Sequence, residues 1–187
     1  HNPVQYAYRT AGLVRGKHPY ALIVDEYRKD DDQHLYQWLM QVPEDVRIAS
    51  RSVGTPGQDE VLELLLGEKE GDRRLLLRVL AAGAELSEAK LVQTETKLES
   101  YEKRDRGNVT TYQRISLPLK SVHGHFVILL HPHCKGQPMP VTVWNGDRTQ
   151  VTITIGDQKD VVNFAMTESG RTQVRIARNR EDIACTD

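Results

Sequence analysis

The chain is poor in cysteine, has no long apolar run and carries no excess of basic residues. Its 187 residues include two cysteines, Cys134 and Cys185, which are too few for a disulfide framework. These two can pair only if the C-terminal tail folds back. No apolar run approaches the ~18 residues of a transmembrane helix, so we expect no membrane partner. The formal net charge is −1, so we expect no nucleic-acid partner either.

Sequence motifs for common catalytic chemistry are also missing. The chain has no Gly-rich phosphate loop, no Gly-x-Ser-x-Gly elbow and no Cys-x-x-Cys pair. The adjacent carboxylates Asp25 and Glu26 would point to opposite faces of a strand, so they cannot form a glycosidase pair by themselves. We therefore expect no catalytic residue and no cofactor. The chain shows no signal peptide, and because it begins abruptly at His1 and not at Met we interpret it as a fragment of a longer protein.

The dominant hydrophobic period is two. Val151–Ile155 alternates strictly, whereas Val61–Leu66 and Leu75–Leu80 are short apolar runs, and both patterns are typical of strands. Turn residues such as Asn145-Gly146 separate the candidate strands. Strands are predicted at Gln5–Val14, Tyr20–Glu26, His34–Gln41, Val46–Val53, Val61–Leu66, Leu75–Leu80, Thr110–Ser116, His125–His131, Val141–Trp144, Val151–Ile155, Val161–Thr167 and Thr172–Ala177.

The segment Ala84–Lys103 has the composition of a helix, but its centre alternates like a strand. We favour a strand at Lys90–Leu98. With no convincing long helix, the pattern predicts an all-β fold: a two-layer antiparallel β-sandwich, supersandwich-like, with little helix. No linker divides the chain, so residues 1–187 are expected to form one domain.

Two histidine pairs share one predicted strand. His123 and His125 are two residues apart, as are His131 and His133, so each pair shares a strand face. The pairs would lie roughly 25 Å apart at ~3.3 Å per residue, too far to share one ion. Each pair would need another ligand for zinc. We therefore favour ordinary exposed histidines, predict no metal site, and expect no stoichiometric zinc.

An aromatic strand begins at His34. Tyr36 and Trp38 follow on the same face, at i+2 and i+4. Aromatic rings beside polar groups can hold the apolar face of a sugar, but the same alternation also builds a sheet core. Both interpretations remain open from the sequence.

The first quarter of the chain resembles the heparinase II/III-like family of polysaccharide lyases. The resemblance rests on Tyr8-Arg9, on the strand that ends in Val24-Asp25-Glu26, and on the strand His34–Met40 after a polar turn. Two positions depart from the family pattern. Tyr8 stands where a histidine is common, and Met40 lies at the end of the strand where several relatives have a metal-binding histidine.

The resemblance implies a C-terminal β-sandwich whose parent chain carries an upstream helical toroid domain as its partner. Family members cleave acidic polysaccharides by β-elimination at a uronic acid, which requires a base, an acid and carboxylate neutralisation. The fragment is then structural and cleft-forming, not catalytic alone. The resemblance implies substrate-binding roles for Arg9, His34, Tyr36 and Trp38, an acidic polysaccharide or oligosaccharide as partner, and a periplasmic or secreted location.

Other functions remain open on the sequence. The main alternative is a free-standing carbohydrate-binding β-sandwich without lyase activity. A third is a metal-dependent enzyme built around the histidine pairs.

Overall fold

Antiparallel sheets make up the computed structural model, which describes residues 4–43, 46–53, 61–66, 73–82, 92–99, 109–179 and 181–185. These residues form strands and turns and include no helix. Sheet A contains, in spatial order, β1 (Tyr6–Val14), β2 (Tyr20–Arg28), β9 (His123–Cys134), β6 (Arg73–Ala82), β5 (Val61–Leu66) and β4 (Ile48–Val53). The described part of the chain has no helix long and apolar enough to cross a membrane.

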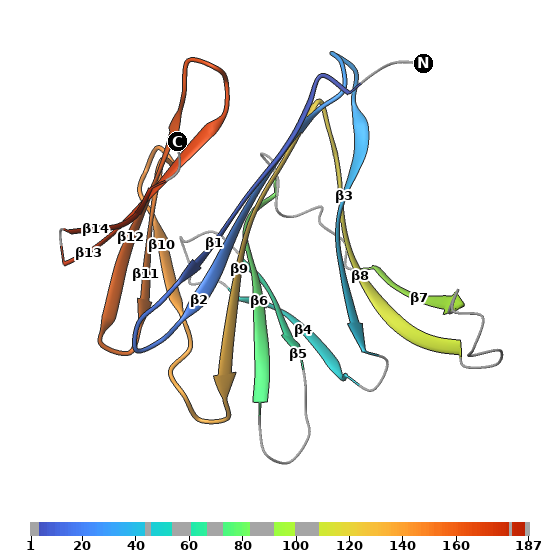
Figure 1. Ribbon diagram of the computed structural model, residues 1–187, viewed down its shortest axis with the longest axis horizontal. Coiled ribbons are helices and arrows are strands. Elements are labelled where there is room, and N and C mark those ends of the chain that lie inside the picture. Colours follow the sequence, from blue (N-terminus) through green and yellow to red (C-terminus); the bar gives the residue numbers. More distant parts are fainter. Residues whose placement is uncertain are drawn as a thin grey trace.

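Two smaller sheets accompany sheet A. Sheet B contains β3 (His34–Pro43), β8 (Val109–Ser121) and β7 (Val92–Glu99). Sheet C is a meander of β10 (Val141–Trp144), β11 (Gln150–Ile155), β12 (Gln158–Met166), β13 (Thr172–Arg178) and β14 (Glu181–Cys185). Figure 1 shows sheet A between the other two, with sheet C at the left and sheet B at the right.

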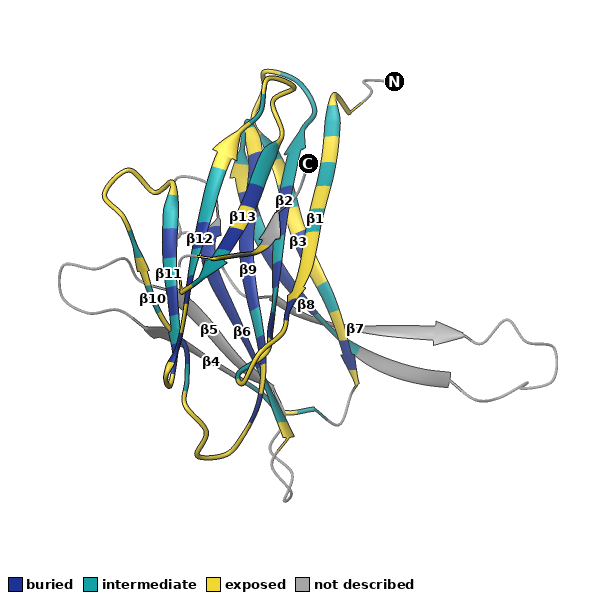
Figure 2. Ribbon diagram, turned by 60° about the vertical axis from the view of Figure 1, so that its left-hand side comes forward, coloured by how far each residue is buried: buried dark blue, intermediate teal, exposed yellow. Residues whose placement is uncertain are grey.

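The core between sheets A and C is mainly aliphatic. Alternate residues of each strand face this core, as the banded burial colours of β11 and β12 illustrate in Figure 2. Its buried members are Val14, Tyr20, Leu22, Val24, Leu80, Ala81, Val127, Leu129, Val151, Ile153, Ile155, Val162, Val174 and Ile176.

The core between sheets A and B is richer in aromatic residues. Its buried members are Trp38, Val42, Leu77, Val79, Ile115, Leu117, Leu119, Phe126 and Ile128, and Tyr27 and Tyr36 pack against them. Sheet A thus contributes side chains to both cores, because successive residues of a strand point to opposite faces.

The all-β antiparallel sandwich predicted from the sequence is confirmed, and it has one layer more than the expected two. The reason lies in β9, where Phe126–Leu129 is buried on both faces. A continuous apolar run of this kind is typical of a strand covered on both sides, whereas strict alternation is typical of a strand with one solvent face. The strand within Ala84–Lys103 is confirmed as β7, and β14 was not anticipated.

Two predicted strands extend through a proline. β8 continues past Pro118, where β7 no longer pairs with it, so that β3 is its remaining neighbour. β9 continues past Pro132, where β2 no longer pairs with it and β6 remains. A proline has no N–H to donate, so a strand tolerates it where one side needs no hydrogen bond.

Candidate functional site

Arg9 lies on the edge strand β1, directly opposite Asp25 of β2. Its Nε and Nη2 groups donate to the two carboxylate oxygens of Asp25, at 2.7 and 2.6 Å. The Asp25 side chain is fully buried, whereas that of Arg9 is 52% exposed. The hydrogen bond to Asp25 raises the pKa of Arg9 above its ordinary value. Arg9 thus neutralises a buried carboxylate, while half of its side chain remains accessible.

Asp25 connects Arg9 to two stacked tyrosines. Tyr27 shares a face of β2 with Asp25, and burial, with a smaller contribution from the Asp25 carboxylate, raises the pKa of Tyr27 to about 12. The Tyr27 ring stacks on Tyr36 of β3, with centroids 6.0 Å apart and planes 15° from parallel. Arg9 and Tyr36, which are distant in sequence, therefore belong to one connected group of side chains.

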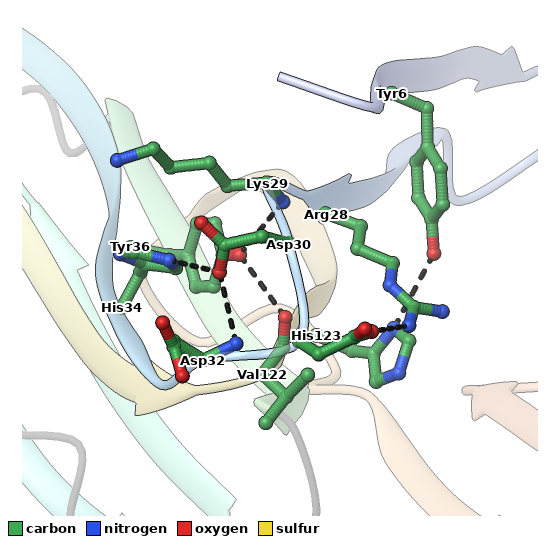
Figure 3. Close-up of polar contacts among 10 residues, drawn as sticks. Tyr6, Arg28, Lys29, Asp30, Asp32, His34, Tyr36, Val122 and His123 are labelled. Carbon is green, nitrogen blue, oxygen red and sulfur yellow. Dashed lines mark hydrogen bonds and ion pairs between the residues drawn. The ribbon is translucent and has the colours of Figure 1, made fainter. Parts of the chain in front are cut away.

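His34 lies at the outer end of this group, beside the β2–β3 turn (Figure 3). Its Nε2 is 2.6 Å from Oδ1 of Asp30, and this hydrogen bond is the main cause that lowers the pKa of Asp30. Tyr36 donates its hydroxyl proton to the Val122 carbonyl and accepts a bond from the Lys29 amide, at 3.1 and 3.3 Å. Three of the four predicted binding residues, Arg9, His34 and Tyr36, thus lie in one region.

Trp38 does not join them at the surface. Its side chain is 2% exposed and lies in the core between sheets A and B. The predicted ligand-binding role of Trp38 is therefore wrong for this structure, and the alternative core interpretation holds. The cause is sheet A, which covers the face of β3 on which Trp38 lies.

A second group of aromatic side chains, which the sequence analysis did not single out as a site, lies on the opposite face of β1. The rings of Tyr6 and Tyr8 stack, with centroids 5.4 Å apart and planes 8° from parallel. The guanidinium carbon of Arg171 lies 4.9 Å from the Tyr8 ring centroid. We name Tyr6, Tyr8 and Arg171 the tyrosine platform. In the sequence, the i, i+2 spacing of the two tyrosines is the signal that identifies this group, because it places both rings on one face of a strand.

Sheet register adds polar side chains beside the platform. Tyr6, Arg28 and His123 form one row across β1, β2 and β9. The Tyr6 hydroxyl is 3.4 Å from Nδ1 of His123, as Figure 3 shows. Arg28 is ion-paired with Asp31. The row therefore places a guanidinium and an imidazole next to the Tyr6 ring.

The next row consists of Tyr8, Glu26 and His125. Glu26 accepts two hydrogen bonds from Thr172 of β13, from the backbone N–H at 2.9 Å and from the hydroxyl at 2.6 Å. These bonds join sheet A to sheet C at the edge of their shared core. Burial lowers the pKa of His125, which favours its neutral ring.

The second histidine pair lies near the other end of β9. His131 and His133 share a face of the strand and are largely buried, so the prediction that they are exposed is wrong. Cys134, next to them, is an exposed free thiol. Within the described ranges, no group of three or more His, Cys, Asp or Glu side chains is arranged to hold a metal ion.

The chain matches no family model, and no curated protein matches its sequence.

Proposed function

We propose that this chain is a β-sandwich that contacts an acidic polysaccharide, as the C-terminal part of a heparinase II/III-like polysaccharide lyase. The observation that carries the proposal is the tyrosine platform, in which two parallel rings lie beside the Arg171 guanidinium. A flat ring covers the apolar face of a sugar, and guanidinium groups bind carboxylates and sulfates with charge-assisted hydrogen bonds. The platform combines both kinds of contact.

The position of the platform also favours this function. β1 is an edge strand of sheet A, and Tyr6 and Tyr8 are only half-buried there. Arg28 and His123 extend the polar surface across the neighbouring strands. Arg9 lies on the other face of sheet A and His34 begins β3 of sheet B, and both are contacts for a polymer that wraps around β1.

Binding to heparan sulfate, alginate and hyaluronan tests the proposal, with dextran as the uncharged control. We expect Tyr8→Ala to weaken binding of the preferred acidic polymer about 5–10-fold, since an aromatic contact contributes about 1 kcal/mol. Leu13→Ala is the matched control, because Leu13 is 67% exposed on the same strand. Equal loss in both variants, or equal binding of dextran, would contradict the proposed role.

A cleavage assay addresses the catalytic part of the proposal. We expect no eliminative cleavage by this chain alone, measured as no rise in absorbance of unsaturated uronate. A rise that disappears in His34→Ala would instead place catalytic chemistry beside Asp30. Polymer binding without a lyase parent chain would favour the alternative of a free-standing carbohydrate-binding module.

A further inference from the structure

The tyrosine platform is built from two sheets, and one carboxylate lies where they meet. Tyr8 is the direct partner of Glu26 across β1 and β2, and residues opposite each other in this way have Cβ atoms about 5 Å apart. Arg171 immediately precedes β13 of sheet C, and Thr172 is the first residue of that strand. Arg171 lies over the Tyr8 ring, while Thr172 donates to Glu26. Two consecutive residues of sheet C thus contact two neighbouring strands of sheet A.

The Glu26 carboxylate holds Thr172 with both of its oxygen atoms. Oε2 accepts from the Thr172 backbone N–H at 2.9 Å, and Oε1 accepts from the Thr172 hydroxyl at 2.6 Å. Hydrogen bonds to a charged acceptor are about twice as strong as those between neutral groups. The bond to the backbone N–H also fixes the chain at the residue that follows Arg171, so it determines where the Arg171 side chain begins.

The turn between β12 and β13, which carries Arg171, is exposed. Ala165, Met166 and residues 168–170 are all exposed. Thr167 and Arg171 close the turn through hydrogen bonds with each other, so the turn is held within itself. An exposed turn of this kind keeps one position relative to sheet A only if its base is tied down. The two hydrogen bonds to the β2 carboxylate tie it there.

The contact between Arg171 and Tyr8 is by itself a weak restraint. The guanidinium carbon is 4.9 Å from the ring centroid, and the Arg171 side chain is exposed. A cation–π contact at an exposed site contributes less free energy than a pair of hydrogen bonds to a charged group, and an arginine side chain loses much rotamer entropy when it is ordered. The position of the guanidinium therefore depends on where β13 begins.

We propose that Glu26 is a positioning residue of the tyrosine platform, which holds Arg171 over Tyr8 and so gives the platform its preference for acidic over neutral sugars. Glu26 acts through Thr172 and needs no contact with the sugar. The part that concerns sugars rests on the proposed function, whereas the positioning of Arg171 does not. A carboxylate beside a bound anion opposes binding by its charge, so positioning and charge predict opposite effects when Glu26 is neutralised.

Nuclear magnetic resonance without any sugar tests the positioning alone. Protons above an aromatic ring resonate upfield, so Tyr8 should shift the Arg171 Hδ protons upfield, and Tyr8→Leu gives the unshifted reference. We expect Thr172→Val to remove about half of this shift or more, because it deletes the hydroxyl donor without a change of charge. Thr172→Ser keeps the hydroxyl and should restore the shift. An Arg171 shift in Thr172→Val equal to that of the wild type would overturn the proposal.

Binding of heparan sulfate, alginate and hyaluronan separates positioning from charge, with dextran again as the uncharged polymer. We expect Glu26→Gln to weaken binding of the preferred acidic polymer about threefold or more, because a neutral amide is a weaker acceptor for Thr172. The ratio of acidic-polymer binding to dextran binding should fall with it, and Thr172→Val should have the same effect.

Glu168→Gln is the matched control, because it removes the same charge from the exposed β12–β13 turn. We expect it to leave binding of the acidic polymer unchanged. Tighter binding in both Glu26→Gln and Glu168→Gln would show that Glu26 acts only through its charge, and would overturn the proposal.

The two experiments distinguish the positioning from the proposed function. If the wild type binds none of the three acidic polymers while Thr172→Val still releases Arg171 from Tyr8, the proposed function fails and the positioning stands. If the wild type binds, and Thr172→Val changes neither the Arg171 shift nor the binding, the positioning fails and the proposed function stands.

Discussion

The two ends of β9 carry the same sequence pattern, His-x-His, in different surroundings. Both pairs point toward sheet C, because they occupy alternate positions of one strand. His123 is exposed and His125 is adjacent to Glu26, whereas His131 and His133 are buried and line a pocket together with Lys17 and Arg73. The pattern fixes the face that a side chain takes, but its charge environment comes from the strands and turns that pack around it.

The residue between the two histidines of each pair lies on the opposite face of β9. In the first pair this residue is Gly124. The Tyr27 and Tyr36 rings pack closely against it, because an added Cβ would lie 2.9 Å from the Tyr27 ring and 2.7 Å from the Tyr36 ring. The residue at the second pair is Pro132, which is exposed. The face of β9 opposite the histidines is therefore covered at Gly124 and open to solvent at Pro132.

Among the substitutions that test this difference, the replacement of Gly124 should have the largest effect on the free energy of unfolding. We expect Gly124→Ala to lower the free energy of unfolding by about 3 kcal/mol, the high end for an overpacked site, because both neighbouring rings are held by stacking. Urea unfolding measures it. Gly12→Ala is the matched control on β1, where an added Cβ meets nothing within 4 Å. A Gly124→Ala protein as stable as Gly12→Ala would contradict the close packing.

Removal of Glu26 should have the next largest effect. We expect Glu26→Ala to cost about 2 kcal/mol of unfolding free energy, since two donors of Thr172 lose a charged acceptor. Glu168→Ala in the exposed β12–β13 turn is the control, with an expected change within about 0.5 kcal/mol. Equal effects of the two substitutions in urea unfolding would show that Glu26 does not join sheets A and C.

Acid should destabilise both ends of β9 through one histidine at each end, His125 and His131. Burial lowers the pKa of His125 and of His131 below the ordinary value of 6.5. The unfolded chain therefore binds protons near pH 6.5 that the folded chain does not bind until lower pH. The stabilisation is complete above about pH 6.5 and is lost as pH falls from there through the folded-state pKa.

Urea unfolding between pH 7.5 and 5.5 measures this slope. We expect His125→Gln and His131→Gln each to flatten it, because each removes one group that titrates differently in the two states. Identical slopes in wild type and both variants would contradict the effect of burial on these rings.

Replacement of His123 should have the smallest effect. We expect His123→Ala to change the free energy of unfolding by no more than about 0.5 kcal/mol, because the side chain is exposed and its contact with the Tyr6 hydroxyl is long, at 3.4 Å. Urea unfolding again measures it. A loss as large as that of Glu26→Ala would assign His123 a structural role.

Much of the sheet structure follows from local pattern. Alternation predicted β11, and the apolar run Leu75–Leu80 predicted the strand β6, in which Leu76–Leu80 is buried. The pattern did not predict the third layer, since a run that is buried on both faces does not reveal what covers each face. It also placed Tyr36 and Trp38 on one face of β3 without showing that Trp38 would be covered by sheet A.

The sequence by itself determined that this protein is built from antiparallel strands and that His123, His125, His131 and His133 share one face, because a strand has a period of two set by local backbone geometry. Only the tertiary structure decided that Arg9 neutralises Asp25, that Tyr8 lies beside Arg171, and that the second histidine pair is buried. These contacts join residues far apart in the chain. They depend on strand order and sheet packing, which are set by burial across the whole domain and not by the local sequence pattern.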